Sequence, residues 1–190
     1  MKELTPVQHD ALVELLNIGF GRAAASLSQL TGHRVMLDTV LGRVVAQDIA
    51  TVHQIFSGAV AGDALLILSH EAAGTLKELL TDEAPLPLSV DASAREVLTE
   101  VGNVLLNACL GTFGNLLNVQ VSFSVPHLNL ETLRGLLGSL LINREGLQYA
   151  LVVHAGFRLR DAEVTGFLVI VLSVTSLDKL LRSLEAWETR

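Results

Sequence analysis

Residues 62–69 of the chain read GDALLILS, and residues 166–173 read GFLVIVLS. Each stretch runs from a glycine to a serine and is apolar apart from Asp63, which is typical of a strand. Leucines follow both runs at helical spacing, at positions 76 and 80 and again at positions 180 and 184. This recurrence at an offset of 104 residues predicts two copies of one strand–helix unit.

A second repeat lies upstream of each run. Glu14-x-x-Asn17 recurs 86 residues later as Glu100-x-x-Asn103, at a similar point in each of two long helical patterns. The first helix has Thr5 as its N-cap and Pro6 at its first position, and it runs to about Leu30. The second runs from a cap at Ser89 or Asp91 to about Leu117. The second unit therefore carries 18 more residues between its helix and its last hairpin.

The other segments fall between these landmarks. A Pro-containing loop over 81–87 is the best boundary, so we expect one domain over 1–190 built of internal repeats 1–87 and 88–190. The predicted fold is α/β (of the α+β type), in which duplicated helix–strands–helix units share a mostly antiparallel sheet around a pseudo-two-fold axis. We expect strands over 34–45, 51–56, 59–68, 119–125, 147–159 and 163–172, and shorter helices over 70–80, 131–141 and 178–187.

The composition limits the possible partners and location. Apolar residues make up 50% of the 190 residues and the net charge is −7, which predicts a large core and argues against a nucleic-acid partner. The apolar runs are too short or too interrupted by Asn and Gln to span a bilayer, and the first residues do not resemble a signal peptide. Cys109 is the single cysteine. We therefore expect a cytoplasmic protein with no membrane insertion, and a packing role for this thiol.

The repeated Glu and Asn carry the chemical signal. Residues at i and i+3 share one face of a helix, so each pair presents a carboxylate beside a carboxamide. A carboxamide both donates and accepts hydrogen bonds, so it can hold a water molecule against an electrophile without reacting itself. Phosphoryl transfer depends mostly on such positioning. One Glu-x-x-Asn would indicate only a solvated helix face, but its repetition in a chain with few charges favours a functional site.

With these residues the chain resembles the CheC/CheX/FliY phosphatases of bacterial chemotaxis. Their motif is Asp or Ser, three residues, Glu, two residues, Asn, then twenty-two residues and Pro. The first motif copy matches at Asp10, Glu14 and Asn17 but has Val40 at the proline position. The second motif copy matches at Glu100, Asn103 and Pro126, and Glu96 occupies its leading position.

The resemblance implies that the two long helices lie side by side and that each bears an active site. It implies that Glu14 and Glu100 engage the active-site Lys of a response-regulator receiver domain, and that Asn17 and Asn103 orient the water that attacks the aspartyl phosphate. The Mg²⁺ would belong to the receiver, so the chain itself would bind no cofactor and no metal. The implied partner is a phosphorylated CheY-like receiver, with a CheD-type deamidase as a further candidate.

The two copies are unequal. A proline fixes a rigid turn that valine cannot impose, so we expect Pro126 to make the second copy the better site. The first copy is then either active or degenerate. The alternative to a phosphatase is a non-catalytic module that binds a receiver, a CheD-type deamidase or the flagellar switch.

Two other patterns carry less weight. Gly19-x-Gly21-x-x-Ala24 superficially matches a dinucleotide-binding fingerprint, but its glycines lie inside a predicted helix instead of after a strand. Close packing between helices is the expected role of these glycines. The six histidines show no metal-ligand spacing.

Overall fold

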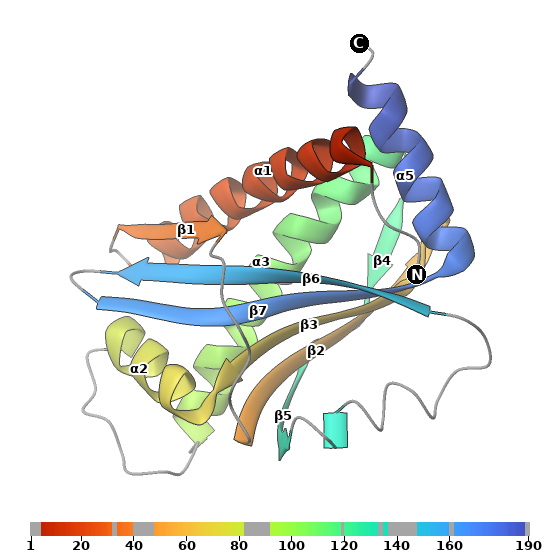
Figure 1. The fold of residues 1–190 in the computed structure, drawn as a ribbon. Coiled ribbons are helices and arrows are strands. Elements are labelled where there is room, and N and C mark those ends of the chain that lie inside the picture. Colours follow the sequence, from red (N-terminus) through yellow and green to blue (C-terminus); the bar gives the residue numbers. More distant parts are fainter. Residues whose placement is uncertain are drawn as a thin grey trace.

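The computed structural model shows a layer of helices packed on one antiparallel sheet (Figure 1). Its longest helices, α1 (Pro6–Thr31) and α3 (Ala92–Leu117), have the bounds that the sequence predicts to within one or two residues. Two shorter helices, α2 (His70–Thr81) and α5 (Val174–Glu188), directly follow strands. The structure describes residues 5–31, 34–39, 48–81, 92–118, 120–132, 135–136, 148–159 and 162–188.

The strands pair in the order β1-β6-β7-β3-β2-β4, and β5 also pairs with β2. Every pair is antiparallel, as the sequence predicts. The bounds are β1 Val35–Thr39, β2 Asp48–Gly58, β3 Gly62–Ser69, β4 Val121–Phe123, β5 His127–Thr132, β6 Gln148–Leu159 and β7 Ala162–Ser173.

The sheet has the pseudo-two-fold arrangement expected from the repeats. Its centre is the β3–β7 pair, in which Leu65 lies opposite Val169, the residue 104 positions later. Outward from this pair, β2 occupies the position that β6 occupies on the other side, and β4 with β5 corresponds to β1. Ala64 of β3 corresponds to Leu168 of β7, which lies 104 residues later. The strand partner of Ala64 is Gln54 and the strand partner of Leu168 is Val153, so Gln54 and Val153 occupy corresponding positions in the two halves of the sheet.

Serines at the ends of the repeated runs explain where α2 and α5 begin. Ser69 Oγ accepts a hydrogen bond from the Ala72 amide at 3.0 Å, and Ser173 Oγ accepts one from the Ser176 amide at 3.2 Å. Both serines are therefore N-caps. The predicted start of the last helix, at Asp178, is wrong by four residues because the cap lies at the end of the strand itself.

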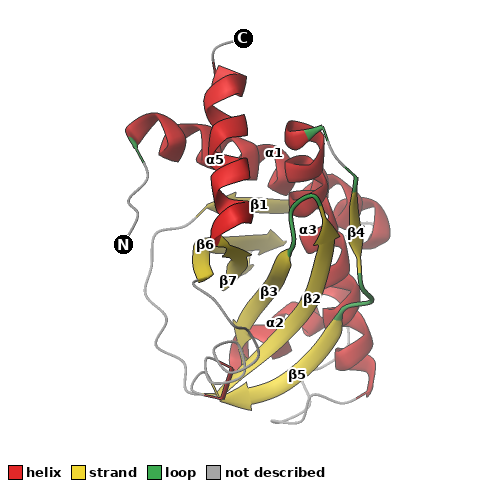
Figure 2. Cartoon of the chain, turned by 90° about the vertical axis from the view of Figure 1, so that its right-hand side faces the viewer, coloured by secondary structure: helices red, strands yellow, loops and turns green. Residues whose placement is uncertain are grey.

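The segment after α3 also differs from the prediction. The helix ends at Leu117, and Asn118 follows it with a φ of 52°, a left-handed conformation that asparagine tolerates at the C-terminus of a helix. The predicted strand over 119–125 is only β4, and the predicted helix over 131–141 begins in β5, which includes residues 131 and 132. Strand pairing along β2 outweighs the local helical pattern at residues 131 and 132, whereas residues 135–136 are helical as predicted. Residues 133–134 and 137–141 lie outside the described part (Figure 2).

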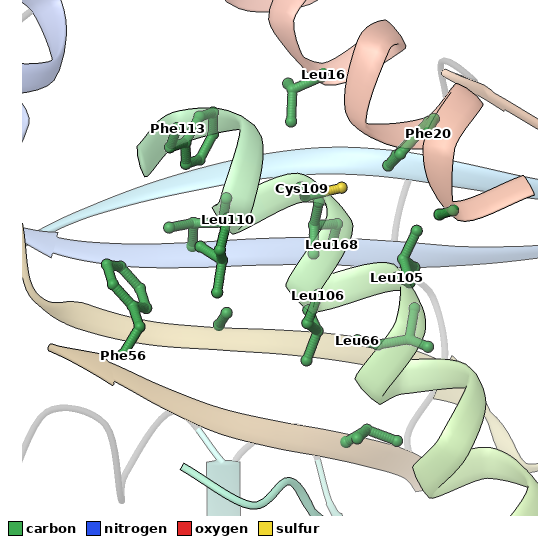
Figure 3. Packing of buried hydrophobic residues seen from close by; sticks show 14 of the residues in the cluster. Leu16, Phe20, Phe56, Leu66, Leu105, Leu106, Cys109, Leu110, Phe113 and Leu168 are labelled. Carbon is green, nitrogen blue, oxygen red and sulfur yellow. The ribbon is translucent and has the colours of Figure 1, made fainter. Parts of the chain in front are cut away.

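The main core lies between the sheet and the helices. Figure 3 shows Leu106 and Leu110 of α3 beside Phe56 and Leu66 of the sheet, with Phe20 of α1 on the other side of α3. The two long helices are side by side, as predicted: a Cβ at Gly19 would lie 3.0 Å from the Cys109 Cα. The other face of the sheet carries a smaller core of Ile49, Leu65, Ile67, Leu136 and Val171.

Helix α3 is apolar enough over residues 92–115 to cross a membrane, the one such helix in the described parts of the chain. Slightly more than half of its most apolar window is buried, 56%, and it packs against α1 and the sheet. A core helix of a soluble protein meets the same criterion, so this feature gives little support to a membrane span.

Candidate functional site

The second motif copy lies on the exposed side of α3. Glu96 and Glu100 are exposed and Asn103 is half-buried, one turn further along the same helix. Both carboxylates line a hollow of about 660 Å³. Its walls are a mixture of apolar and charged side chains from the ends of α1 and α2 and the beginning of α3: Leu30, Leu80, Arg95, Val97, Thr99 and Val101.

A glycine inside the motif brings α3 directly onto strand β2. A Cβ at Gly102 would clash with the side chain of Val52, whose Cβ would be only 2.7 Å away. Glycine allows such an approach because it has no side chain. The backbone of α3 next to Asn103 therefore lies close to β2, which places polar groups of the helix within reach of polar groups of the strand.

Four residues then form a continuous chain of hydrogen bonds, which we call the amide chain: Ser124, Gln54, Asn107 and Asn103. Gln54 Nε2 donates to the Ser124 carbonyl at 3.0 Å and to Asn107 Oδ1 at 3.1 Å. Asn107 Nδ2 in turn donates to Asn103 Oδ1 at 2.7 Å. The motif asparagine is thus connected to the edge of the sheet through two further amides.

The far end of the amide chain is a β-bulge that contains Pro126. Between the pairs His53–His127 and Phe56–Phe123, two residues of β2 face three residues, 124–126. Ser124 fixes the bulge with two bonds to Ile55, one from its amide to the Ile55 carbonyl and one from the Ile55 amide to its Oγ, each 2.9 Å. Proline lacks an amide hydrogen and is tolerated in a strand at such bulges. Pro126, which is buried, therefore belongs to the structure that anchors the amide chain.

The first motif copy is arranged differently. Asp10, Glu14 and Asn17 are all exposed on α1, and Asp10 lies 3.4 Å from the ring of His9. One turn after Asn17, where α3 has Asn107, the chain has Gly21, which carries no side chain that could hold Asn17. Val40, at the proline position of the motif, lies outside the described residues.

The structure keeps the two copies apart. Helix α1 runs antiparallel to α3: Gly19 lies against Cys109, whereas Leu30 near the end of α1 shares a hollow with Glu100 near the beginning of α3. Glu14 and Asn17 therefore lie towards the opposite end of the helix pair from the second copy. The arrangement is two separate Glu–Asn pairs and not one site with four residues.

Of the residues in the amide chain, only Asn103 is predicted from the motif. Asn107 offers a sequence signal, because it is one of the polar residues that interrupt the apolar stretch after Val104 and it lies four residues after Asn103, on the same face of the helix. Gln54 offers none, because it lies 53 residues before Asn107 and the contact depends on how α3 crosses β2.

The glycine prediction is only half correct. Gly19 does lie against Cys109 of α3, but a Cβ at Gly21 would meet no atom of the described residues within 4 Å. Cys109 is buried as expected, and burial raises the pKa of its thiol to about 12. A protonated thiol is a poor nucleophile, so it takes no part in the site.

Another polar group lies on the opposite face of the sheet. His53 Nε2 is 3.0 Å from the carboxylate of the buried Asp63, and His53 precedes Gln54 in the strand, so its side chain points away from α3. Burial raises the pKa of Glu131 nearby, and His53 opposes this shift. Within the described ranges, no three His, Cys, Asp or Glu side chains gather closely enough to hold a metal ion.

No protein-family model matches the sequence. Solved structures do share its fold. FliY from Thermotoga maritima has a TM-score of 0.77 at 16% identity, over 97% of this chain and 99% of that chain. The FliM middle domain from H. pylori has a TM-score of 0.63 at 9% identity, over 95% and 99% of the two chains. The CheX-CheY-BeF3-Mg²⁺ complex from Borrelia burgdorferi contains a chain with a TM-score of 0.54 at 16% identity, over 82% and 96%. The resemblance to CheX and FliY is therefore confirmed at the level of the fold.

Proposed function

We propose that the chain is a phosphatase of two-component signalling in chemotaxis, and that it hydrolyses the aspartyl phosphate of a response-regulator receiver domain. The observation that supports this most directly is the arrangement of the second motif copy. Glu100 is exposed on the same helix face as Asn103, and a bulge that contains Pro126 anchors the amide chain ending at Asn103.

In this proposal the two side chains have separate roles. The exposed Glu100 carboxylate forms an ion pair with the active-site Lys of the receiver and docks α3 against it. The Asn103 amide then orients a water molecule whose oxygen attacks the phosphorus atom, in line with the bond to the aspartyl oxygen. That bond breaks, the aspartate leaves as a carboxylate and the phosphoryl group leaves as inorganic phosphate.

No cofactor of this chain is needed for these steps. The receiver carries the Mg²⁺ that neutralises the phosphoryl oxygens, so we propose that the chain supplies neither metal ligands nor a nucleophile. Receivers are cytoplasmic signalling domains, and we place this chain in the same compartment. CheX in the solved complex is accompanied by CheY, which supports a CheY-like partner. Neither the likenesses in fold nor the site supports a CheD-type deamidase, and we do not propose one.

The alternative is a non-catalytic binding module. The FliM structures resemble this chain with TM-scores of 0.63 to 0.66, above the 0.54 of the chain in the CheX-CheY complex, and one of them is a complex with FliG. The amide chain favours the phosphatase, because a docking surface does not require a partly buried hydrogen-bond chain behind one asparagine.

A phosphate-release assay separates the two functions. Purified receivers are phosphorylated with acetyl phosphate, the free phosphodonor is removed, and phosphate is followed with and without the chain. A phosphatase shortens the lifetime of at least one phosphorylated receiver at substoichiometric amounts. Binding to a receiver with no change in that lifetime would support the binding module and exclude the proposed reaction.

A further inference from the structure

We infer that Gln54 and Asn107 are positioning residues, which fix the orientation of the Asn103 amide for the attack of water. This inference rests on the proposed function, and it assigns roles to two residues outside the Glu-x-x-Asn motif. Gln54 is only 1% exposed, so it cannot touch a docked receiver, and Asn107 is half-buried, with its Nδ2 bonded to Asn103 Oδ1. They act through the hydrogen bonds that connect them to Asn103.

The orientation of each amide follows from one backbone group. The Ser124 carbonyl can only accept hydrogen bonds, so Gln54 must turn its Nε2 towards it. The same Nε2 also donates to Asn107, which must therefore present its Oδ1 to Gln54 and its Nδ2 to Asn103. Asn103 accepts this last bond with its Oδ1. The two orientations of the motif amide thus differ in energy, although an amide on a solvated surface would exchange between them freely.

For the reaction, this means that the hydrogen-bonding groups of the Asn103 amide are held in one orientation at the surface of α3. The 2.7 Å bond holds the plane of the Asn103 amide and uses one lone pair of Oδ1. Among the described residues no further hydrogen bond to this side chain is seen, so the other lone pair and both Nδ2 hydrogens are available for the water and the phosphoryl oxygens. A pre-oriented group does not have to reorganise as the reaction proceeds, and such preorganisation accounts for much of the effect of polar groups in active sites.

The burial of Gln54 is not explained by packing. Its Oε1 is buried with no hydrogen-bond partner among the described residues, which costs about 1–3 kcal/mol. The unpaired oxygen opposes stability, whereas the nitrogen of the same amide makes two hydrogen bonds, which is consistent with a positioning role for Gln54.

The first motif copy supplies an internal comparison. It has Gly21 where α3 has Asn107, and Val153 where β2 has Gln54. Neither position therefore carries an amide side chain, although the Glu and Asn of that copy are present. The hydrogen bonds from Gln54 through Asn107 therefore belong to the second copy of the motif, and the inference predicts that this copy, with Asn103, catalyses the faster reaction.

The test compares three variants of the full chain with the wild type: Asn107→Asp, Gln54→Val and the control Asn115→Asp. The first cannot donate to Asn103, and the second places in β2 the residue found in the other half. The control makes the same change on an exposed part of α3. Three quantities are measured: kcat and KM on a phosphorylated receiver, affinity for a receiver carrying beryllofluoride as a stable phosphoryl mimic, and the NMR signals of the Asn103 side-chain amide.

We expect kcat to fall about 10-fold to 100-fold in Asn107→Asp and Gln54→Val, less than for complete removal of a positioned group. KM and the affinity should change less than about 2-fold, since Glu100 is intact, and Asn115→Asp should match the wild type. The Asn103 amide signals should move in the first two variants only. If Asn107→Asp and Gln54→Val keep the kcat of the wild type, or lose affinity for the receiver as much as they lose kcat, the inference is overturned and the proposed function still stands. A wild type that hydrolyses no receiver phosphate would overturn both, and unmoved Asn103 signals would separately refute the amide chain.

Discussion

Asn107 Nδ2 donates a 2.7 Å hydrogen bond to Asn103 Oδ1, one turn earlier in α3. The equivalent bond cannot form in α1, because Gly21 stands one turn after Asn17. Two copies of Glu-x-x-Asn therefore share a sequence pattern but differ in what lies beneath the asparagine. This difference underlies our assignment of the stronger activity to the second copy.

Glu100→Gln should weaken docking more than it slows chemistry. The change removes the negative charge but keeps nearly the same shape, and a hydrogen bond to a charged group contributes about 1.5–3 kcal/mol when it is desolvated. We expect KM for a phosphorylated receiver to rise by about 10-fold or more, with kcat reduced much less. Glu14→Gln is the matched control and should change KM by less than about 2-fold. A larger effect in the control would show that α1 carries the main docking site.

Gly102→Ala should destabilise the protein. The added Cβ would lie 2.7 Å from the Val52 Cβ, so α3 must move away from β2, and overpacking of this kind costs about 1–3 kcal/mol. Gly21→Ala lies in an exposed part of α1, where an added Cβ would meet none of the described residues within 4 Å, and should instead stabilise by about 0.4–1 kcal/mol. Urea unfolding of both variants measures the difference. Equal effects of the two changes would contradict the close contact between α3 and β2.

The thiol of Cys109 should make stability depend on pH in the alkaline range. Burial raises its pKa from the ordinary 9.0 to about 12, so between these values the folded chain keeps a proton that the unfolded chain loses. Stability from this group is complete below pH 9 and falls as pH rises, by up to about 1.4 kcal/mol per unit. The free energy of unfolding of the wild type should therefore decline more steeply than that of Cys109→Ala over this range. Parallel pH profiles would show that the thiol is not buried as described.

The helices and the central strands are predictable because their signals are local. Thr5 and Gln8 form a reciprocal capping box, in which each side chain bonds the other residue's backbone amide, so α1 begins where the sequence indicates. The repeated serines show the limit of this reasoning. Ser173 caps α5 as Ser69 caps α2, yet the later Asp178 looks equally suitable in the sequence, and only the end of the strand decides between them.

The site is predictable in part for the same reason. Glu100 and Asn103 lie on one turn, so their common face follows from helical geometry alone. The bulge at Pro126, the approach of Gly102 to Val52 and the contact with Gln54 depend on the register of β2 with its neighbours. Such register is set by the whole sheet, and a single sequence does not reveal it.

The most direct test of the central claim is the rate of phosphate loss from a phosphorylated receiver with wild type, Asn103→Ala and Asn17→Ala. We predict that the wild type accelerates the loss, that Asn103→Ala reduces this acceleration by about 10²–10³-fold, and that Asn17→Ala retains most of it. Circular dichroism of each variant confirms that the fold is intact. Full activity in Asn103→Ala, with or without a loss in Asn17→Ala, would contradict the account.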